Sequence, residues 1–473
     1  MLSLAAAKPF KFVYANDLDA FIPELWANES VQILVENMVV ANLVHRDFSN
    51  EVAKFGDLVN TRKPAEFTAK RKTNADSVTV QDATATNIQV PLDQHFHTSF
   101  MIKDGEESKS FKQLSDEYLK PAVLSIARAV DQVLLGEAHA FYANAEGIAG
   151  GLTTSNIINY IVETRKRMNI NKAYEEGRNL ILTPDTESIA LQVSTFHEAD
   201  KVGDEGTAMR EASLGRKFQF NIYMCQNASS TTGIPVNASY PLVDLTAGYA
   251  KGTTVVHVDT AGSSLAVGQW ISVGGVLHHV TALGTLSTQD IDVTITPALR
   301  VAVANDAVVT IGAEGAVNFA TGYSAGYAKE VVISGITGII PVGSLVSFST
   351  AGTPNVIKTG IYSVIETTET ATNTTGITLN KPLEVALVNT DIVQFGPPAQ
   401  HNFAFHRNAL ALVSRPLAPA PSGLALSSVA SFGGVGIRVT ITYNGSQQGV
   451  LVTVDLLCGL EVLDTNLGAV LIG

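Results

Sequence analysis

Few residues of this chain have types and spacings that could support chemistry. His95 and His97 would share one face of a strand and could begin a metal site, but no acidic or cysteine residue lies nearby at ligand spacing. His278 and His279 would point to opposite faces of a strand and could not hold one ion together. The Glu106-Glu107 pair lies in a charged loop and is typical of a solvated surface. We therefore predict no catalytic, metal or cofactor site, and a protein that is not an enzyme.

The glycine-rich segment 432–436 and the two cysteines also favour structural roles. The segment precedes a predicted strand, whereas a nucleotide-binding loop opens a helix, so we expect a turn there. The sequence contains no Gly-x-x-x-x-Gly-Lys-Ser/Thr phosphate loop. Cys225 and Cys458 each lie in an apolar stretch, which favours two buried, reduced thiols over a disulfide or a metal pair. This pattern predicts folding in a reducing cytoplasm.

The composition is apolar and poor in charge. Hydrophobic residues make up 46% of the 473 residues, charged residues make up 16%, and the mean hydropathy is +0.19. No stretch approaches the ~20 apolar residues of a membrane helix, and the N-terminus lacks the long apolar core of a signal peptide. We expect such a chain to bury apolar surface against copies of itself. The net charge of −13 argues against binding duplex DNA through its phosphates.

Residues 55–102 are expected to form a long two-stranded hairpin. Extended, alternating patterns flank a polar tip that contains the run Lys70-Arg71-Lys72. Because isolated hairpins are marginal in water, this one should lie on a neighbouring subunit. Lys70, Arg71 and Lys72 are therefore candidate intersubunit contacts with acidic surface on that neighbour. The alternative is an ordinary solvated tip.

The elements around the hairpin predict an α+β fold. A first unit, residues 1–54, holds an N-terminal arm and an amphipathic helix over 29–43, with Pro23 interrupting the segment before it. Residues 103–150 hold the longest helical pattern, which begins near Pro121. Residues 151–233 alternate helix and strand, with a buried strand over 179–183 leading into a helix after Pro184. Residues 401–473 return as long strands.

Residues 234–400 predict an all-β insert made of two repeats, at about 246–312 and 326–396. Charged residues are sparse there, and Thr, Val, Gly and Ile alternate in short runs. Three matches relate the repeats: Gly248-Tyr249-Ala250-Lys251 with 326–329, Val267-Gly268 with 342–343, and 293–312 with 377–396 without gaps. We expect two copies of one β module that pack against each other through apolar faces.

This order of elements resembles the major capsid proteins of tailed double-stranded DNA bacteriophages, which have the Hong Kong 97-type fold. On that resemblance Phe55–Ile102 is the extended loop, and Phe111–Tyr142 is the spine helix of the peripheral domain. Ile157–Cys225 and the returning strands would build the apical domain. The podovirus coat proteins with an inserted β-barrel are more similar still. The segments that carry this likeness are Val267–Val273, Val293–Pro297, Ala409–Pro416 and Asp464–Val470.

The resemblance implies a structural protein that assembles through hexamers and pentamers into the icosahedral shell around viral double-stranded DNA. The implied partners are many copies of the chain, a scaffolding protein, a portal and a cement protein. The packaged DNA would be contacted without sequence specificity, and no membrane is involved. The implied location is the virion, after assembly in the host cytoplasm. Two alternatives stay open: an encapsulin-type compartment shell, and a phage tail or adhesin protein.

Overall fold

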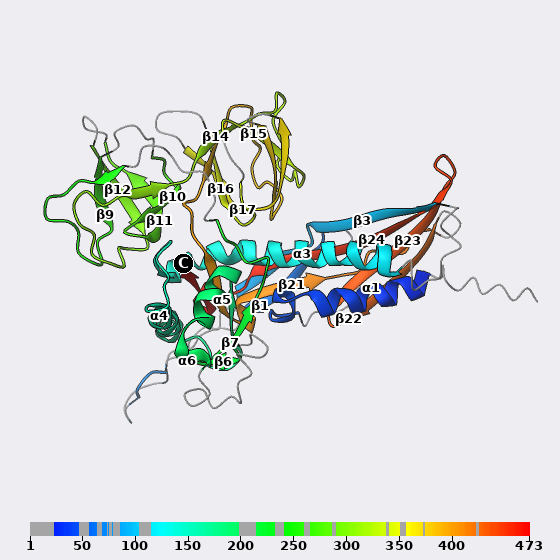
Figure 1. Cartoon of the computed structure of the whole chain (residues 1–473), viewed down its shortest axis with the longest axis horizontal. Helices are drawn as coiled ribbons and strands as arrows, with labels where there is room; N and C mark the ends of the chain where they lie inside the picture. Colours follow the sequence, from blue (N-terminus) through cyan, green and yellow to red (C-terminus); the bar gives the residue numbers. More distant parts are fainter. Residues whose placement is uncertain are drawn as a thin grey trace, which may run out of the picture.

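The computed structural model shows an elongated molecule in which one long helix connects a large sheet to a smaller mixed domain and to two β modules (Figure 1). It describes residues 23–46, 56–63, 69–72, 74, 78, 86–103, 115–197, 214–231, 241–259, 265–285, 290–336, 340–350, 356–371, 374–421 and 425–473. The predicted N-terminal arm and the Glu106-Glu107 pair lie outside these residues.

A continuous helical run over residues 115–144 forms the spine of the molecule (Figure 1). It begins as a π-helical turn, η4 (Ser115–Leu119), continues as α3 (Lys120–Gly136) and ends as a 3-10 run, η5 (Glu137–Asn144). The predicted proline lies in the first turn of α3, where its missing N–H costs nothing. The apolar face of α3 is buried through Val123, Ile126, Ala127, Val130 and Leu134.

Helix α1 (Pro23–Asn37) packs along α3 and differs from its prediction. The sequence predicts a helix over 29–43 and an interruption at Pro23. In the structure Pro23 begins the helix, and a 3-10 turn, η2 (Val40–Asn42), follows its end. The cause is a long-range contact: the carboxylate of Asp131 on α3 accepts hydrogen bonds from the N–H groups of Val39, Val40 and Ala41. Because these three N–H groups donate to Asp131, they are not available to continue the α-helix past Asn37.

A five-stranded antiparallel sheet packs against these two helices. Its order is β21 (Leu410–Ser414), β24 (Gly449–Val462), β23 (Val435–Asn444) and β22 (Leu426–Phe432), and β3 (Gln94–Lys103) also pairs with β24. The β3–β24 register runs from Gln94 opposite Cys458 to Lys103 opposite Gly449. The sequence assigns β3 to the hairpin, and this is wrong because the strand pairs along its whole length with β24.

The hairpin itself consists of β1 (Leu58–Lys63) and β2 (Thr86–Pro91). Val59, Val90 and Leu92 form a small buried cluster with side chains that include Val413. Leu58 is 53% exposed. Of the predicted tip, residues 69–72 are described and exposed.

A six-stranded mixed sheet forms the smaller domain, in the order β4 (Glu146–Gly147), β25 (Gly468–Ile472), β20 (His401–His406), β5 (Arg178–Leu182), β7 (Phe220–Met224) and β6 (Arg216–Lys217). Its helices are α4 (Ile157–Ile170), α5 (Pro184–Leu191) and α6 (Ser194–His197). The predicted strand and helix around Pro184 are present. The side chain of Thr183 caps α5 by accepting a hydrogen bond from the N–H of Thr186.

Two β modules lie at the end of α3 that leads into the smaller domain (Figure 1). Module 1 (residues 241–312) has the sheet order β13 (Val309–Ile311), β10 (Trp270–Val273), β11 (Val276–Leu283), β12 (Asp290–Thr296), β9 (Val255–Asp259) and β8 (Leu242–Val243). Module 2 (residues 313–396) is a closed barrel of β19 (Ile392–Phe395), β16 (Leu345–Thr350), β17 (Val356–Ala371), β18 (Thr374–Leu379), β15 (Val331–Ser334) and β14 (Glu314–Val317).

Taken in chain order, the strands of the two modules occupy the same places in their sheets. The hydrogen bonds correspond too, since Gly268 donates to Val280 as Gly343 donates to Val364. The first sequence match needs a correction of register. Gly248 donates to Leu245 and adopts φ +65°, and its counterpart is Gly322, which donates to Phe319 at φ +66°.

A Cβ at either glycine would lie within 2.5 Å of a carbonyl oxygen, that of Val303 or Leu387, so both positions require glycine. The repeated Gly-Tyr-Ala-Lys letters at 326–329 are therefore displaced by four positions from the structural match. A motif of four residues in Gly-rich sequence carries too little information to set the register.

Each module encloses an apolar cluster of its own. The sequence predicts that the modules pack against each other through apolar faces. Trp270 and Leu277 of module 1 and Leu345 of module 2 also belong to the main core cluster of the chain. Both modules are thus anchored on the core.

Candidate functional site: the junction of the β modules with the core

Residues 137–146, which connect the spine helix to the smaller domain, contact α3, α4 and β25 of the core and also both modules. The segment comprises η5 and the start of β4. Strand β4 pairs in parallel with β25, with Glu146 opposite Leu471, and this pairing fixes the position of the Glu146 side chain. Asn144 donates to the carbonyl oxygens of Thr465 and Gly468 at 2.9 and 3.1 Å.

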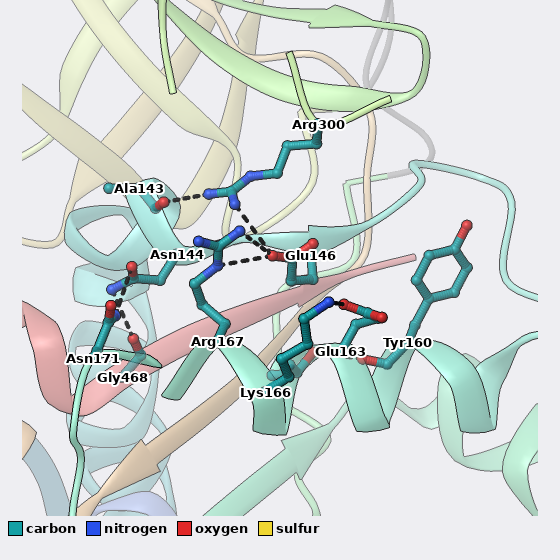
Figure 2. Close-up of polar contacts among 11 residues, drawn as sticks. Ala143, Asn144, Glu146, Tyr160, Glu163, Lys166, Arg167, Asn171, Arg300 and Gly468 are labelled. Atoms are coloured by element: carbon teal, nitrogen blue, oxygen red, sulfur yellow. Dashed lines mark hydrogen bonds and ion pairs between the residues drawn. The ribbon is translucent and has the colours of Figure 1, made fainter. Parts of the chain in front are cut away.

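The carboxylate of Glu146 joins three elements (Figure 2). Its Oε1 accepts hydrogen bonds from Nε and Nη2 of Arg167 on α4, at 2.8 and 2.6 Å, and from Nη1 of Arg300 in module 1 at 3.2 Å. Arg300 also donates to the carbonyl oxygen of Ala143. Burial raises the pKa of Glu146, and the positive charge of Arg167 opposes that rise.

A cleft of about 200 Å³ lies beside this cluster, between α4 and module 1. Tyr160, Glu163 and Lys166 line it from α4 (Figure 2). Lys251 and Arg300 line it from module 1. Lys166 pairs with Glu163 at 2.8 Å along the helix. Both basic residues of module 1 therefore lie on the side that faces the core.

Module 2 is held by a second polar contact, at Glu137, where the 3-10 run η5 begins. Oε1 of Glu137 accepts a hydrogen bond from Nδ2 of Asn380 at 2.9 Å, and Oδ1 of Asn380 accepts one from the N–H of Ser363. Gly136 allows this approach, because a Cβ there would lie 3.1 Å from the Cβ atoms of both Asn380 and Ser363. The end of α3 is thus in van der Waals contact with the barrel.

A buried tyrosine completes the junction. The hydroxyl of Tyr142 hydrogen-bonds Nδ1 of His401 at 2.8 Å, and its ring meets that of Trp270 edge to face at 4.9 Å. Burial lowers the pKa of His401 to about 4, so the imidazole is neutral at pH 7. The uncharged contacts of Tyr142 with His401 and Trp270 therefore hold module 1 against the core.

The residues that the sequence predicts as contacts are not part of this junction. Lys70, Arg71 and Lys72 are exposed. His95 and His97 lie on the large sheet with ring centroids 6.3 Å apart, and Nε2 of His95 lies 3.9 Å from Asp455, which the sequence pattern does not reveal. The glycine-rich segment makes the β22–β23 turn, as predicted, with positive φ at Gly433 and Gly434.

Both cysteines are free and buried, as predicted. Burial raises the pKa of Cys225 to about 11, so the thiol is a poor nucleophile. Gly322-Tyr323-Ser324-Ala325-Gly326 has the spacing of the Gly-x-Ser-x-Gly nucleophile elbow. It lies between β14 and β15, not at a strand-to-helix turn, and therefore lacks the geometry that exposes a nucleophilic serine.

Sequence reasoning missed the junction residues Glu137, Tyr142, Glu146, Arg300 and Asn380. None of them belongs to a motif, and their partners are distant in sequence. A charged residue in an otherwise charge-poor β segment, as Arg300 is, was the available signal.

Among the described residues, no helix has the length and apolar character needed to cross a membrane.

No family model matches the sequence, and no curated protein matches it. Solved structures give similar chains at low identity. A chain of Mycobacterium phage Che8 is 12% identical with a TM-score of 0.41, over 92% of this chain and 90% of that one. A chain from the capsid of the cyanophage P-SCSP1u is 9% identical, also at 0.41, over 92% and 87%. A chain of the mature capsid of bacteriophage PhiM1 is 8% identical at 0.38, over 92% and 86%.

Proposed function

We propose that the chain is the major structural subunit of a bacteriophage capsid, and that many copies assemble into an icosahedral shell around double-stranded DNA. The observation that carries this proposal is the hairpin β1–β2. It buries Val59 and Val90 against its own chain but leaves Leu58 53% exposed, and the basic residues 70–72 beyond it are exposed. A two-stranded hairpin is marginal in water, so contact with a second copy would stabilise it.

The arrangement of the core supports the same proposal. A helical spine lies against a large antiparallel sheet and leads into a second sheet with its own helices. In the proposed Hong Kong 97-type fold these are the peripheral and apical domains, and the hairpin is the extended loop. Such a subunit is extended and has several faces, which lets identical chains contact one another in hexamers and pentamers.

The modules are proposed as a tandem insertion into the apical domain. The chain leaves the apical sheet near Thr231 and returns at Ala399, and hydrogen bonds join these two residues. The carbonyl oxygen of Ala399 accepts a hydrogen bond from the N–H of Thr231 at 2.9 Å, and the N–H of Ala399 donates to Oγ1 of Thr231, also at 2.9 Å. Adjacent ends of this kind allow a domain to be inserted without disturbing its host. We place the modules on the outer surface of the shell, where they would brace the subunit.

An exposed-thiol experiment tests that placement. Ser324 is exposed in module 2, and both natural cysteines are buried. In intact shells, a bulky maleimide should label Ser324→Cys, because the modules face outward. Labelling that appears only after the shells are dissociated would contradict the outward placement.

The proposed partners follow from the shell. Copies of the chain are the main partner, with a scaffolding protein, a portal and a cement protein as further ones, in a virion assembled in the host cytoplasm. The acidic chain suits a container that does not adhere to packaged DNA, because like charges repel. The role proposed is structural and not enzymatic.

Electron microscopy of the full-length protein, together with analysis of its contents, tests this function. Closed shells that copurify with double-stranded DNA when expressed with the other packaging proteins would support it. Closed shells that instead enclose a cargo enzyme would favour the encapsulin-type alternative. Fibres, or a stable monomer at every salt and protein concentration, would contradict a shell.

A further inference from the structure

We infer that module 1 carries a binding site for a divalent transition-metal ion, formed by His257, Asp244 and Asp290. One ligand atom from each of these side chains lies within 4.8 Å of the other two. An imidazole nitrogen with two carboxylate oxygens suits ions such as Zn²⁺, which bind these groups at about 2.0–2.2 Å. Small side-chain rotations bring three such atoms around one ion, and water completes the coordination.

The strands place these residues together. His257 on β9 is opposite Asp292 on β12, and Asp290 lies two residues along the same strand, hence on the same face. Asp244 follows β8, and its N–H donates to the carbonyl oxygen of His257 at 2.9 Å. The site is therefore set by three backbone segments that hydrogen bonds hold in register.

Asp292 orients the imidazole. Its Oδ1 lies 2.8 Å from Nδ1 of His257. A carboxylate that accepts the Nδ1 proton leaves Nε2 as the free electron pair, which is the tautomer that binds a metal. Asp292 is thus a positioning residue and not a ligand.

The charge of module 1 is distributed unevenly. Its sequence contains five acidic residues and two basic ones, Lys251 and Arg300. Both basic residues line the cleft against α4. The carboxylates of Asp244 and Asp290 are thus brought close to each other on another part of the module without a lysine or arginine from module 1 beside them. A bound cation would relieve their repulsion.

Module 2 provides an internal comparison, because it has the same strands and lacks the chemistry. Its counterpart of His257 is Val332, since both N–H groups donate to a tyrosine hydroxyl, that of Tyr249 or Tyr323. Asp244 corresponds to Asn318, which donates to the carbonyl of Val332. The strand pairing places Thr374 where module 1 has Asp290. All three ligands are therefore specific to module 1 and are not required by the fold.

The test is calorimetric titration of the full-length chain with ZnCl₂. The wild type should bind one ion per chain with a saturable isotherm. His257→Val and Asp244→Asn each install a residue found at that position of module 2, so they should fold, and each should weaken binding at least ~10-fold. Asp292→Asn should also weaken binding, by ~10-fold. The control is Asp306→Asn, which removes an exposed charge of the same module and should bind as the wild type does.

Thermal unfolding without added metal shows whether each variant is folded. Loss of binding by a variant that is folded can then be assigned to the missing ligand. No saturable binding by the wild type would overturn the site. Binding as tight as that of the wild type in both His257→Val and Asp244→Asn would also overturn it, because the ion would then be held elsewhere. The site does not depend on shell assembly, so its failure leaves the proposed function untouched.

Discussion

Arg300 of module 1 and Glu146 of the core form an ion pair at 3.2 Å across the boundary between the two. Their side chains are 11% and 16% exposed, so water screens the pair only in part. Arg167 shares the same carboxylate oxygen, and Arg300 also holds the carbonyl of Ala143. One arginine therefore links module 1 both to the end of the spine and, through Glu146, to helix α4.

Replacing Arg300 with methionine should loosen module 1 from the core. The change leaves Glu146 with one guanidinium partner and removes the contact with Ala143, so we expect a loss of about 1–3 kcal/mol in the free energy of unfolding. Urea denaturation measures this loss, and limited proteolysis should cut the ends of module 1 faster. Arg300→Lys keeps the charge but not both contacts, so its free energy of unfolding should lie between those of the wild type and Arg300→Met. Wild-type stability and proteolysis in Arg300→Met would show that the ion pair does not hold the module.

The protonation of Asp131 should stabilise the folded protein more at pH 4 than at pH 7. Burial raises the pKa of Asp131 from 3.8 to about 6, against the effect of its three N–H donors. The folded state therefore binds the proton more tightly than the unfolded state does. This contribution to stability is full below pH 4 and is lost as the pH rises from about 4 to about 6, a difference of about 3 kcal/mol.

The difference between the unfolding free energies of wild type and Asp131→Asn isolates this contribution. That difference should change steadily between pH 4 and pH 6 and be flat from pH 7 to pH 8. Asp306→Asn is the matched control, since it removes an exposed aspartate. A difference that is constant across pH 4–8 would mean that Asp131 keeps an ordinary pKa in the folded chain.

His401 should act in the opposite direction. Burial lowers its pKa from 6.5 to about 4, so the folded state binds this proton less tightly than the unfolded state. Its contribution is full above pH 6.5 and is lost as the pH falls towards 4, by about 3 kcal/mol. The stability of wild type relative to His401→Gln should therefore decrease on acidification. An unchanged relative stability over this range would place His401 in contact with water.

The basic tip should matter for assembly and not for folding. Replacing Lys70, Arg71 and Lys72 with glutamate should leave the unfolding transition of the single chain unchanged, because exposed charges contribute little to stability. Assembly, followed by light scattering, should be weakened, and more so at low salt, where charge repulsion is least screened. The neutral triple glutamine variant separates loss of attraction from new repulsion. Wild-type assembly by the glutamate variant would exclude the contact.

The sequence predicted those elements whose pattern is local. The heptad-like spacing from Val123 to Leu134 requires a buried helix face wherever the helix packs, and Pro184 after an apolar strand requires a turn into a helix. The repeat of 293–312 in 377–396 was readable because the apolar clusters of the two modules bury corresponding positions of both segments.

Features set by distant contacts could not be predicted in this way. Strand β3 alternates as a hairpin strand would, and its partner β24 lies more than three hundred residues later. The end of α1 depends on Asp131, and the pair of Glu146 with Arg300 depends on how the module docks. In each case the local pattern allows the element, and a contact made only in the folded chain decides its bounds or its role.

The most direct test of the central claim is sedimentation velocity combined with electron microscopy of the purified full-length chain, over a range of salt and protein concentrations. We predict that the chain forms large, closed shells of uniform size, because the hairpin and the charge-poor faces need copies of the chain to cover them. A protein that remains a stable monomer or dimer under all of these conditions would contradict the account.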